Sequence, residues 1–177
     1  TARTEAQDLL WHFDAVARLA RAQIAHALGG ESVDRERIEA ELADRNFVHP
    51  GRLWWAFDWE DARKQAGLTG QEEPKLLPGT SPENGTVVLV DEIDKAETDV
   101  PNGLLEALGA GSFRPQGRDE PVEVKGSPPL VIITTNEERA LPDAFVRRCL
   151  VHNLRLPDDD PRSEERRVGK ECPSPCR

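Results

Sequence analysis

The sequence contains no methionine, only three cysteines and no long uninterrupted run of apolar residues. A membrane-spanning helix needs about 20 mostly apolar residues, and the polar first residues do not form a secretory signal peptide. Three cysteines in a chain of this length are not a disulfide framework. We therefore expect a soluble, cytoplasmic protein. The absence of methionine also suggests that the reading frame begins within a longer gene.

Basic side chains are in the minority, with 23 Lys and Arg against 33 Asp and Glu, so the formal net charge is −10. This balance disfavours non-specific binding to DNA or to anionic membranes, because both interactions require positive charge on the protein. Apolar residues make up 37% of the 177 residues. Together with the glycines they reach the low end of the globular range, so we expect one packed domain.

The first half of the chain is predicted to be helical, with an aromatic segment behind the helices. Thr4 and Gln7 have the spacing of a capping box, and the apolar residues that follow predict one helix ending at Gly29–Gly30. That apolar stripe consists of Leu9, Leu10, Phe13, Val16, Leu19, Ala20 and Ile24. A second helix is expected over 34–42. The aromatic residues of 46–60 are interpreted as core, with a partner-facing patch as the alternative.

From Thr86 onward, β-branched runs alternate with helical segments. The expected elements are strands at 86–90, 130–134 and 150–156, helices at 101–108 and 142–148, and a hairpin at 112–125. The first two strands are expected to be buried on both faces of a parallel sheet. Strands that alternate with helices predict an α/β layered fold with a mostly parallel sheet.

Two carboxylates, Asp91 and Glu92, directly follow the strand 86–90. Ligands of open α/β sheets bind beyond the carboxyl ends of the strands, so both side chains are expected to face a site. In the hydrolysis of nucleoside triphosphates, one such carboxylate holds Mg²⁺, usually through water, and its neighbour polarises the attacking water. The pair therefore indicates a nucleotide-hydrolysing site.

Two further motifs are consistent with this chemistry. Asn136 follows the next buried strand, where its amide could hydrogen-bond a terminal phosphate or the attacking water; a helix N-cap or turn residue is the alternative. Arg147 and Arg148 end a short predicted helix, and a guanidinium can neutralise charge on a transferred phosphoryl group. A pair of solvated surface arginines is the alternative interpretation.

From Thr1 to Asp160, the sequence resembles the MoxR-type branch of the AAA+ ATPases. Residues 87–96 resemble its Walker B strand, 100–108 the helix after it, 134–139 its sensor-1 segment, 141–149 its arginine-finger helix, and 4–10 the stretch after its second strand. The resemblance implies an incomplete P-loop NTPase fold of three layers, with ATP and Mg²⁺ as cofactors.

The resemblance also implies a role for each site residue. Asp91 would hold Mg²⁺ through water, Glu92 would activate the attacking water, and Asn136 would sense the γ-phosphate. Arg148 would be the finger that acts on the neighbouring subunit's nucleotide. It is chosen over Arg147 because the family's finger usually lies directly before the apolar residue that leads into the last strand.

The sequence departs from the family in one motif and at both ends. It contains no Gly-x-x-x-x-Gly-Lys-[Ser/Thr] loop, the Walker A loop whose backbone N–H groups cradle phosphates. In the family this loop and the first strand precede the position of Thr1, and a helical lid follows that of Pro157. We therefore expect residues 1–161 to be a partial AAA+ core without its first strand, and the chain by itself to lack ATPase activity.

The end of the sequence resembles something other than a protein segment. Residues 162–172 read like the in-frame translation of a common sequencing adapter, so 162–177 is expected to be a non-native tail. An ordinary charged tail is the alternative. Cys172 and Cys176 accordingly give no indication of a metal site.

For the whole protein, the resemblance implies a chaperone-like remodelling ATPase that forms a ring, expected to be a hexamer. It would act on a protein client, with a von Willebrand factor A-type partner. A DNA-directed motor or loader is the alternative, but the basic residues of the predicted hairpin are balanced by acidic ones: Arg114, Arg118 and Lys125 against Asp119, Glu120 and Glu123. A non-hydrolysing scaffold is a further alternative, although it would need neither Asp91 nor Glu92.

Overall fold

The computed structural model describes residues 6–28, 35–97 and 100–154. Four features expected from the sequence lie outside these ranges: the capping Thr4, the helix end at Gly29–Gly30, the strand end at 155–156 and the tail 162–177.

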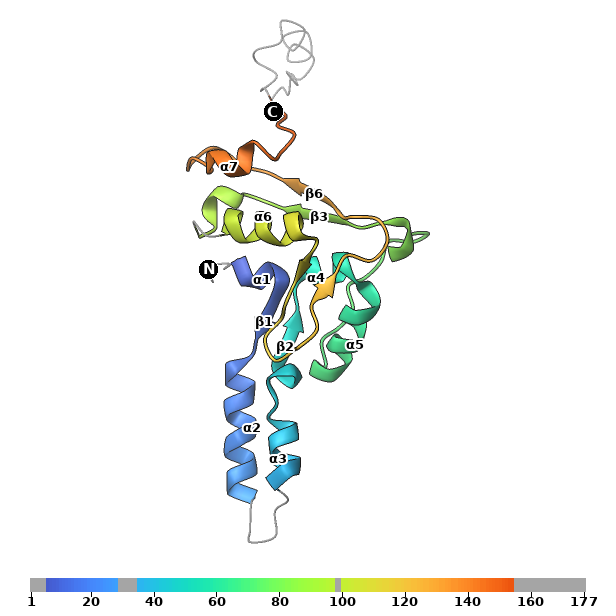
Figure 1. Cartoon of the computed structure of the whole chain (residues 1–177), viewed down its shortest axis with the longest axis vertical. Helices are drawn as coiled ribbons and strands as arrows, with labels where there is room; N and C mark the ends of the chain where they lie inside the picture. Colours follow the sequence, from blue (N-terminus) through green and yellow to red (C-terminus); the bar gives the residue numbers. More distant parts are fainter. Residues whose placement is uncertain (1–5, 29–34, 98–99, 155–177) are drawn as a thin grey trace, which may run out of the picture.

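Helices and short strands follow each other in mixed order (Figure 1). The helices are α1 (Ala6–Leu10), α2 (Ala15–Leu28), α3 (Arg35–Glu41), α4 (Arg52–Phe57), α5 (Trp59–Thr69), α6 (Val100–Ala110) and α7 (Asp143–Val146). The strands are β1 (Trp11–Phe13), β2 (Val48–Pro50), β3 (Val87–Val90), β4 (Ser112–Phe113), β5 (Val122–Glu123) and β6 (Leu130–Ile133). Single 3-10 turns are η1 (Asp44–Phe47), η2 (Pro82–Asn84) and η3 (Ile93–Lys95). None of these helices has the length and apolar character needed to cross a membrane.

The strands β3 and β6 pair in parallel, with Val88 opposite Val131 and Leu89 opposite Ile132. The fold is therefore mixed α/β with a small parallel sheet, as the sequence predicts. The pairs β1–β2 and β4–β5 are antiparallel, so a mostly parallel sheet is not found in the described residues. The β4–β5 pair is the predicted hairpin, whereas β1–β2 was not expected.

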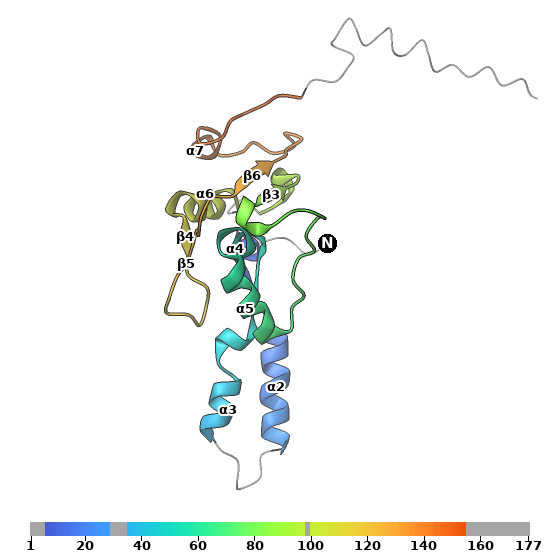
Figure 2. The same cartoon turned by 90° about the vertical axis from the view of Figure 1, so that its right-hand side faces the viewer.

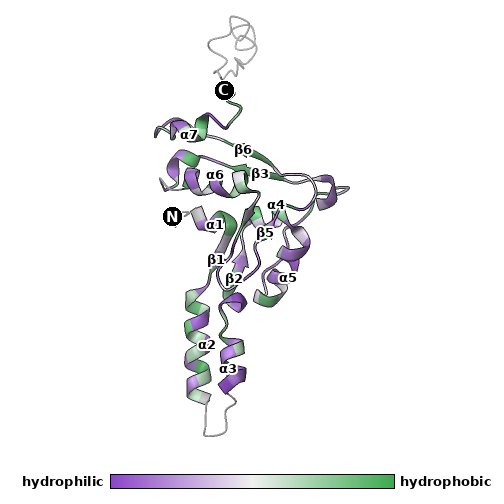
Figure 3. Cartoon of the chain, in the orientation of Figure 1, coloured by the Kyte–Doolittle hydropathy of each residue, from purple (hydrophilic) through white to green (hydrophobic). Residues whose placement is uncertain are grey.

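The parallel pair is buried on one face only, and the expectation of burial on both faces is wrong. Val88 is 8% exposed, whereas Val87 and Leu89 are 65% and 63% exposed. Their partners on β6, Leu130 and Ile132, are also exposed, although Figure 3 colours both strands as hydrophobic. The apolar run therefore predicted the strand correctly, but no described element covers its second face.

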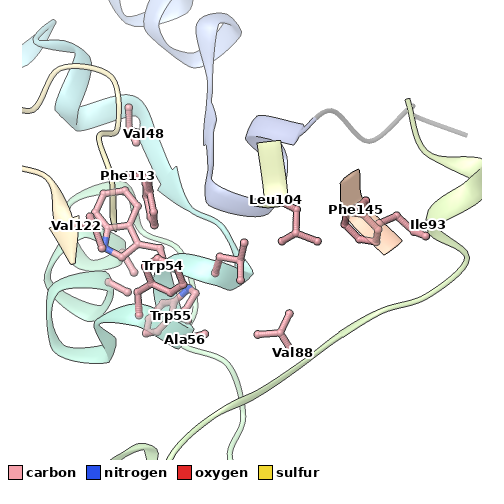
Figure 4. Packing of buried hydrophobic residues seen from close by; sticks show 14 residues of the cluster. Val48, Trp54, Trp55, Ala56, Val88, Ile93, Leu104, Phe113, Val122 and Phe145 are labelled. Carbon is pink, nitrogen blue, oxygen red and sulfur yellow. The ribbon is translucent and has the colours of Figure 1, made fainter. Parts of the chain in front are cut away.

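Aromatic side chains form the centre of the core, which confirms the interpretation of residues 46–60 as core. Trp54 and Phe57 are 0% and 1% exposed. The ring of Phe113, from the hairpin, lies against both, with centroid separations of 5.9 and 5.6 Å. Figure 4 shows the side chains of Trp54 and Phe113 near that of Val122. The aromatic rings thus join α4 to the β4–β5 hairpin.

The single helix predicted from Thr4 to Gly29 is interrupted in the structure. α1 ends at Leu10, β1 follows, and Asp14 then caps α2 by accepting a hydrogen bond from the Ala17 N–H at 2.7 Å. Figures 1 and 2 show α2 and α3 extending together away from the rest of the molecule. The apolar spacing continues across the break, but Val16 and Leu19 of α2 are 79% and 59% exposed. The apolar periodicity therefore did not predict that the first helix ends at Leu10.

Among the remaining predicted elements, two helices agree with the structure, one helix is shorter than predicted, and the last strand is not formed. α3 confirms the second predicted helix within the described residues, and α6 confirms the helix at 101–108. The helix predicted over 142–148 is shorter, since α7 ends at Val146. Residues 150–154 form no strand, against expectation. A strand requires a neighbour for its backbone hydrogen bonds, and β6 pairs only with β3 among the described residues.

Two ion pairs connect the hairpin to helix α5 and to its N-cap residue. Arg118 donates to both carboxylate oxygens of Asp61, at 2.7 and 3.1 Å, and its guanidinium lies over the Trp54 ring. Burial raises the pKa of Asp61, but hydrogen bonds from Arg118 and Trp54 and nearby positive charge lower it more, so the net pKa lies below its usual value. Lys125 forms a second ion pair with Asp58, at 2.6 Å.

A matched pair of substitutions tests the one-sided burial of β3. Val88→Thr places a hydroxyl in the core and is expected to lower the free energy of unfolding by about 1–3 kcal/mol. Val87→Thr changes a side chain that is 65% exposed, so its effect is expected to stay within about 0.5 kcal/mol. Urea unfolding followed by circular dichroism measures both variants. Equal losses would contradict the assigned faces.

Candidate functional site

The candidate site lies at the carboxyl ends of β3 and β6. Because the strands are parallel and paired along their whole length, the segments that follow them emerge at the same sheet edge. The Thr134 N–H donates to the Val90 carbonyl at 3.0 Å, and the Ile93 N–H donates to the Thr134 carbonyl at 3.0 Å. The two segments are therefore tied together through their backbones.

The hydroxyl of Thr134 bridges the acid pair. It donates to Asp91 Oδ1 and accepts a hydrogen bond from the Glu92 N–H at 2.9 Å. One hydroxyl can do both, because it has one donor and two acceptor lone pairs. Thr134 therefore orients the Asp91 carboxylate and the Glu92 backbone at the same time.

Two donors hold the Glu92 carboxylate. Its Oε1 accepts a hydrogen bond from Asn136 Nδ2 at 3.1 Å and another from Lys95 Nζ at 2.8 Å. The hydrogen bond to Glu92 raises the pKa of Lys95 above its usual value. The φ of Glu92 is 51°, in the left-handed region that non-glycine residues rarely adopt. Such backbone conformations are found most often at functional sites.

Asp91, Glu92 and Asn136 thus belong to one hydrogen-bonded group, in which Asp91 is linked to Glu92 through the Thr134 hydroxyl and Asn136 bonds the Glu92 carboxylate directly. Asn136 does not cap a helix, because the next described helix, α7, begins only at Asp143. Asp91 and Asn136 are exposed and Glu92 is partly exposed. The group can therefore be reached from solvent.

Arg147 and Arg148 lie outside this group. Arg148 Nη1 donates to the carbonyl of Ala144, in the preceding helix α7, at 2.8 Å. Both arginines are exposed, and among the described residues neither forms an ion pair with Asp91 or Glu92. This placement fits a solvated pair and also fits an arginine that acts on a neighbouring molecule.

Three residues near the acid pair received no role from the sequence. Thr134 and Lys95 contact the acid pair directly, and Asp94 lies between the two segments. The signal for Lys95 was its position three residues after Glu92, a spacing that brings side chains together on a helical turn. Thr134 could be assigned only once the register of β3 and β6 was known.

Asp94 is a buried carboxylate beside the site, with 4% exposure. Its Oδ2 accepts a hydrogen bond from the Glu138 N–H at 3.0 Å. Burial raises the pKa of Asp94, but hydrogen bonds from backbone N–H groups and from the Thr135 hydroxyl lower it more. The net pKa lies below its usual value, so Asp94 is ionised at neutral pH.

The acid pair fits a hydrated divalent cation better than a closed metal cage. Mg²⁺ typically binds through one or two carboxylates, water and substrate phosphates, and the exposed Asp91 carboxylate could supply one of these ligands. Across residues 6–28, 35–97 and 100–154, no group of three or more His, Cys, Asp or Glu side chains could hold a metal.

Comparisons with protein-family models, with curated proteins and with solved structures find no match.

The bridging role of Thr134 can be tested with two substitutions. Thr134→Val keeps the branched shape but removes the acceptor of the Glu92 N–H. Exchange of the Glu92 amide with solvent is therefore expected to speed up about two- to tenfold. Thr134→Ser keeps the hydroxyl and should leave that rate close to the wild type. Hydrogen exchange followed by NMR measures both, and an unchanged rate in Thr134→Val would rule out the bridge.

Proposed function

We propose that this chain is the Walker B, sensor-1 and arginine-finger part of an ATP-hydrolysing remodelling ATPase of the MoxR-type AAA+ family. The observation that carries the proposal is the hydrogen-bonded group of Asp91, Glu92 and Asn136 at the carboxyl edge of a parallel strand pair. Ligands of parallel α/β sheets bind at this edge. A metal-binding carboxylate, a second carboxylate and an amide are the groups that phosphoryl transfer to water uses.

Each member of the group would have a distinct task. Asp91, oriented by Thr134, would hold Mg²⁺ through water. Glu92 would polarise the attacking water at Oε2, since the contacts from Asn136 and Lys95 are both to Oε1. Asn136 would orient the γ-phosphate or the same water. The bound Mg-ATP would supply the phosphoryl group and the neutralising charge.

On this proposal the chain folds as an incomplete P-loop NTPase core, and the whole protein would supply the Walker A loop. Arg148 would act on the nucleotide of the next subunit in a ring, expected to be a hexamer. Its exposure at the end of α7, apart from its own acid pair, supports this assignment. The protein client, the von Willebrand factor A-type partner and the cytoplasmic location are proposed from the resemblance alone.

A DNA-directed motor or loader fits the hairpin less well. Contacts to nucleic acid phosphates need cations that are free to make them. Arg118 and Lys125 of the hairpin already pair with Asp61 and Asp58. This pairing favours a protein client over a DNA client.

The role of Glu92 is tested in the protein that carries this chain together with its upstream Walker A loop. Glu92→Gln is expected to retain ATP binding, while hydrolysis falls about 10²- to 10⁴-fold because the general base is lost. ATP binding by calorimetry and phosphate release measure the two effects. The control is Glu106→Gln, on the exposed side of α6, which should change neither.

Normal turnover in Glu92→Gln would remove Glu92 from its role. No turnover in the wild-type protein would instead favour the non-hydrolysing scaffold. The 177-residue chain alone is expected to show no turnover, because its sequence lacks the Walker A loop.

Arginine action between subunits is tested by mixing two inactive variants. Arg148→Ala is expected to lower turnover on the order of 10³-fold. Mixing it with Glu92→Gln should restore activity at roughly a quarter of the interfaces, where an intact Glu92 meets an intact Arg148 of the next subunit. The matched variant Arg147→Ala should keep most of its activity. Loss and rescue with Arg147→Ala instead would show that Arg147 is the finger.

A further inference from the structure

Asp94, in the turn η3, lies beside the segment that follows β6. Its Oδ2 accepts a hydrogen bond from the Glu138 N–H at 3.0 Å. Within that segment, the Thr135 hydroxyl accepts a hydrogen bond from the Glu137 N–H at 3.0 Å. Glu137 has a φ of 60°, so the backbone reverses there in a left-handed conformation. After this reversal the Glu138 N–H points to the Asp94 carboxylate.

This carboxylate and the segment 135–138 depend on each other. Asp94 is 4% exposed, and a buried charge is tolerated only where hydrogen-bond donors replace its lost hydration. The Glu138 N–H is one such donor. If the segment moved away, the charge would stay buried without that donor. Asp94 therefore opposes displacement of the segment.

Asn136 lies two residues before Glu138, whose N–H is bonded to Asp94. Its Nδ2 reaches Glu92 Oε1 at 3.1 Å, a contact that a small shift of the segment would break. The ties made by Thr134 to Ile93 and to Glu92 come earlier in the chain and do not involve Asp94. Loss of the Asp94 carboxylate should release Asn136 while the strand ends stay joined.

We propose that Asp94 is a positioning residue, which keeps the Asn136 amide on Glu92 by holding the backbone of Glu138, two residues further along the same segment. The placement stands on the contacts described above. Its consequence for catalysis rests on the proposed function.

Hydrogen exchange in the full 177-residue chain tests the placement. Asp94→Ala is expected to speed exchange of the Glu138 amide about tenfold, because that N–H loses a charged acceptor. The NMR signals of the Asn136 side-chain amide should shift toward the chemical shifts of a solvent-exposed amide. The Ile93 amide, which is bonded to the Thr134 carbonyl, should keep its rate and serves as the internal reference.

Two further variants sharpen the comparison. Asp94→Asn retains an oxygen that can accept from the Glu138 N–H, so it should restore most of the protection and the Asn136 signals. Asp119→Ala, an exposed aspartate in the hairpin, is the control and should change neither readout. If Asp94→Ala does not fold, Asp94→Asn is compared with the wild type, and altered Asn136 signals in this variant would overturn the proposal. Unchanged exchange in Asp94→Ala, or equal acceleration at Ile93, would also overturn it.

Catalysis is tested with a double-mutant cycle in the protein that includes the Walker A loop. Asp94→Ala and Asn136→Ala should each lower kcat more than they change KM, and the double variant should lose no more than Asn136→Ala alone. Additive losses would contradict a role exerted through Asn136. If the wild-type protein does not hydrolyse ATP, the proposed function fails, while the exchange experiment still decides whether Asp94 holds Asn136.

Discussion

Parallel hydrogen bonding between β3 and β6 brings together two segments that are distant in the sequence. Glu92 and Asn136 are 44 residues apart, yet their side chains share a hydrogen bond. A parallel register makes this possible, because both strands end at the same edge and release their next residues there. The contacts between the two segments depend on that register, whereas Lys95 reaches Glu92 within a single turn.

Short polar contacts then set the geometry at this edge. Thr134 joins the acid pair through one hydroxyl, and Lys95 offsets the charge of Glu92. The buried carboxylate of Asp94 accepts a hydrogen bond from the Glu138 N–H, in the segment that follows β6. Neighbouring carboxylates repel one another unless donors and cations lie between them. Here backbone N–H groups, one hydroxyl, one amide and one lysine supply that compensation.

The core supports the site from one side only. Ile93, directly after Glu92, is 2% exposed, and Figure 4 shows its side chain beside that of Phe145 from α7. The aromatic cluster of α4 and the hairpin packs further along the same core. On the opposite face of the sheet, Val87 and Leu89 remain exposed. The site is thus supported by buried side chains on one face of the strand pair, while the other face of the pair is exposed.

Sequence alone determined that the runs at 86–90 and 130–134 are strands, that polar residues follow them, and that the aromatic residues of 46–60 belong to the core. These features are local, since they depend on side-chain type and spacing. Only the tertiary structure decided that the strands are covered on one face, that the stripe from Leu9 to Ile24 is divided between two helices and the strand β1, and that Thr134 contacts the acid pair with Asp94 buried nearby. Such features depend on which segments become neighbours in space, and residue spacing along a chain carries no record of that choice.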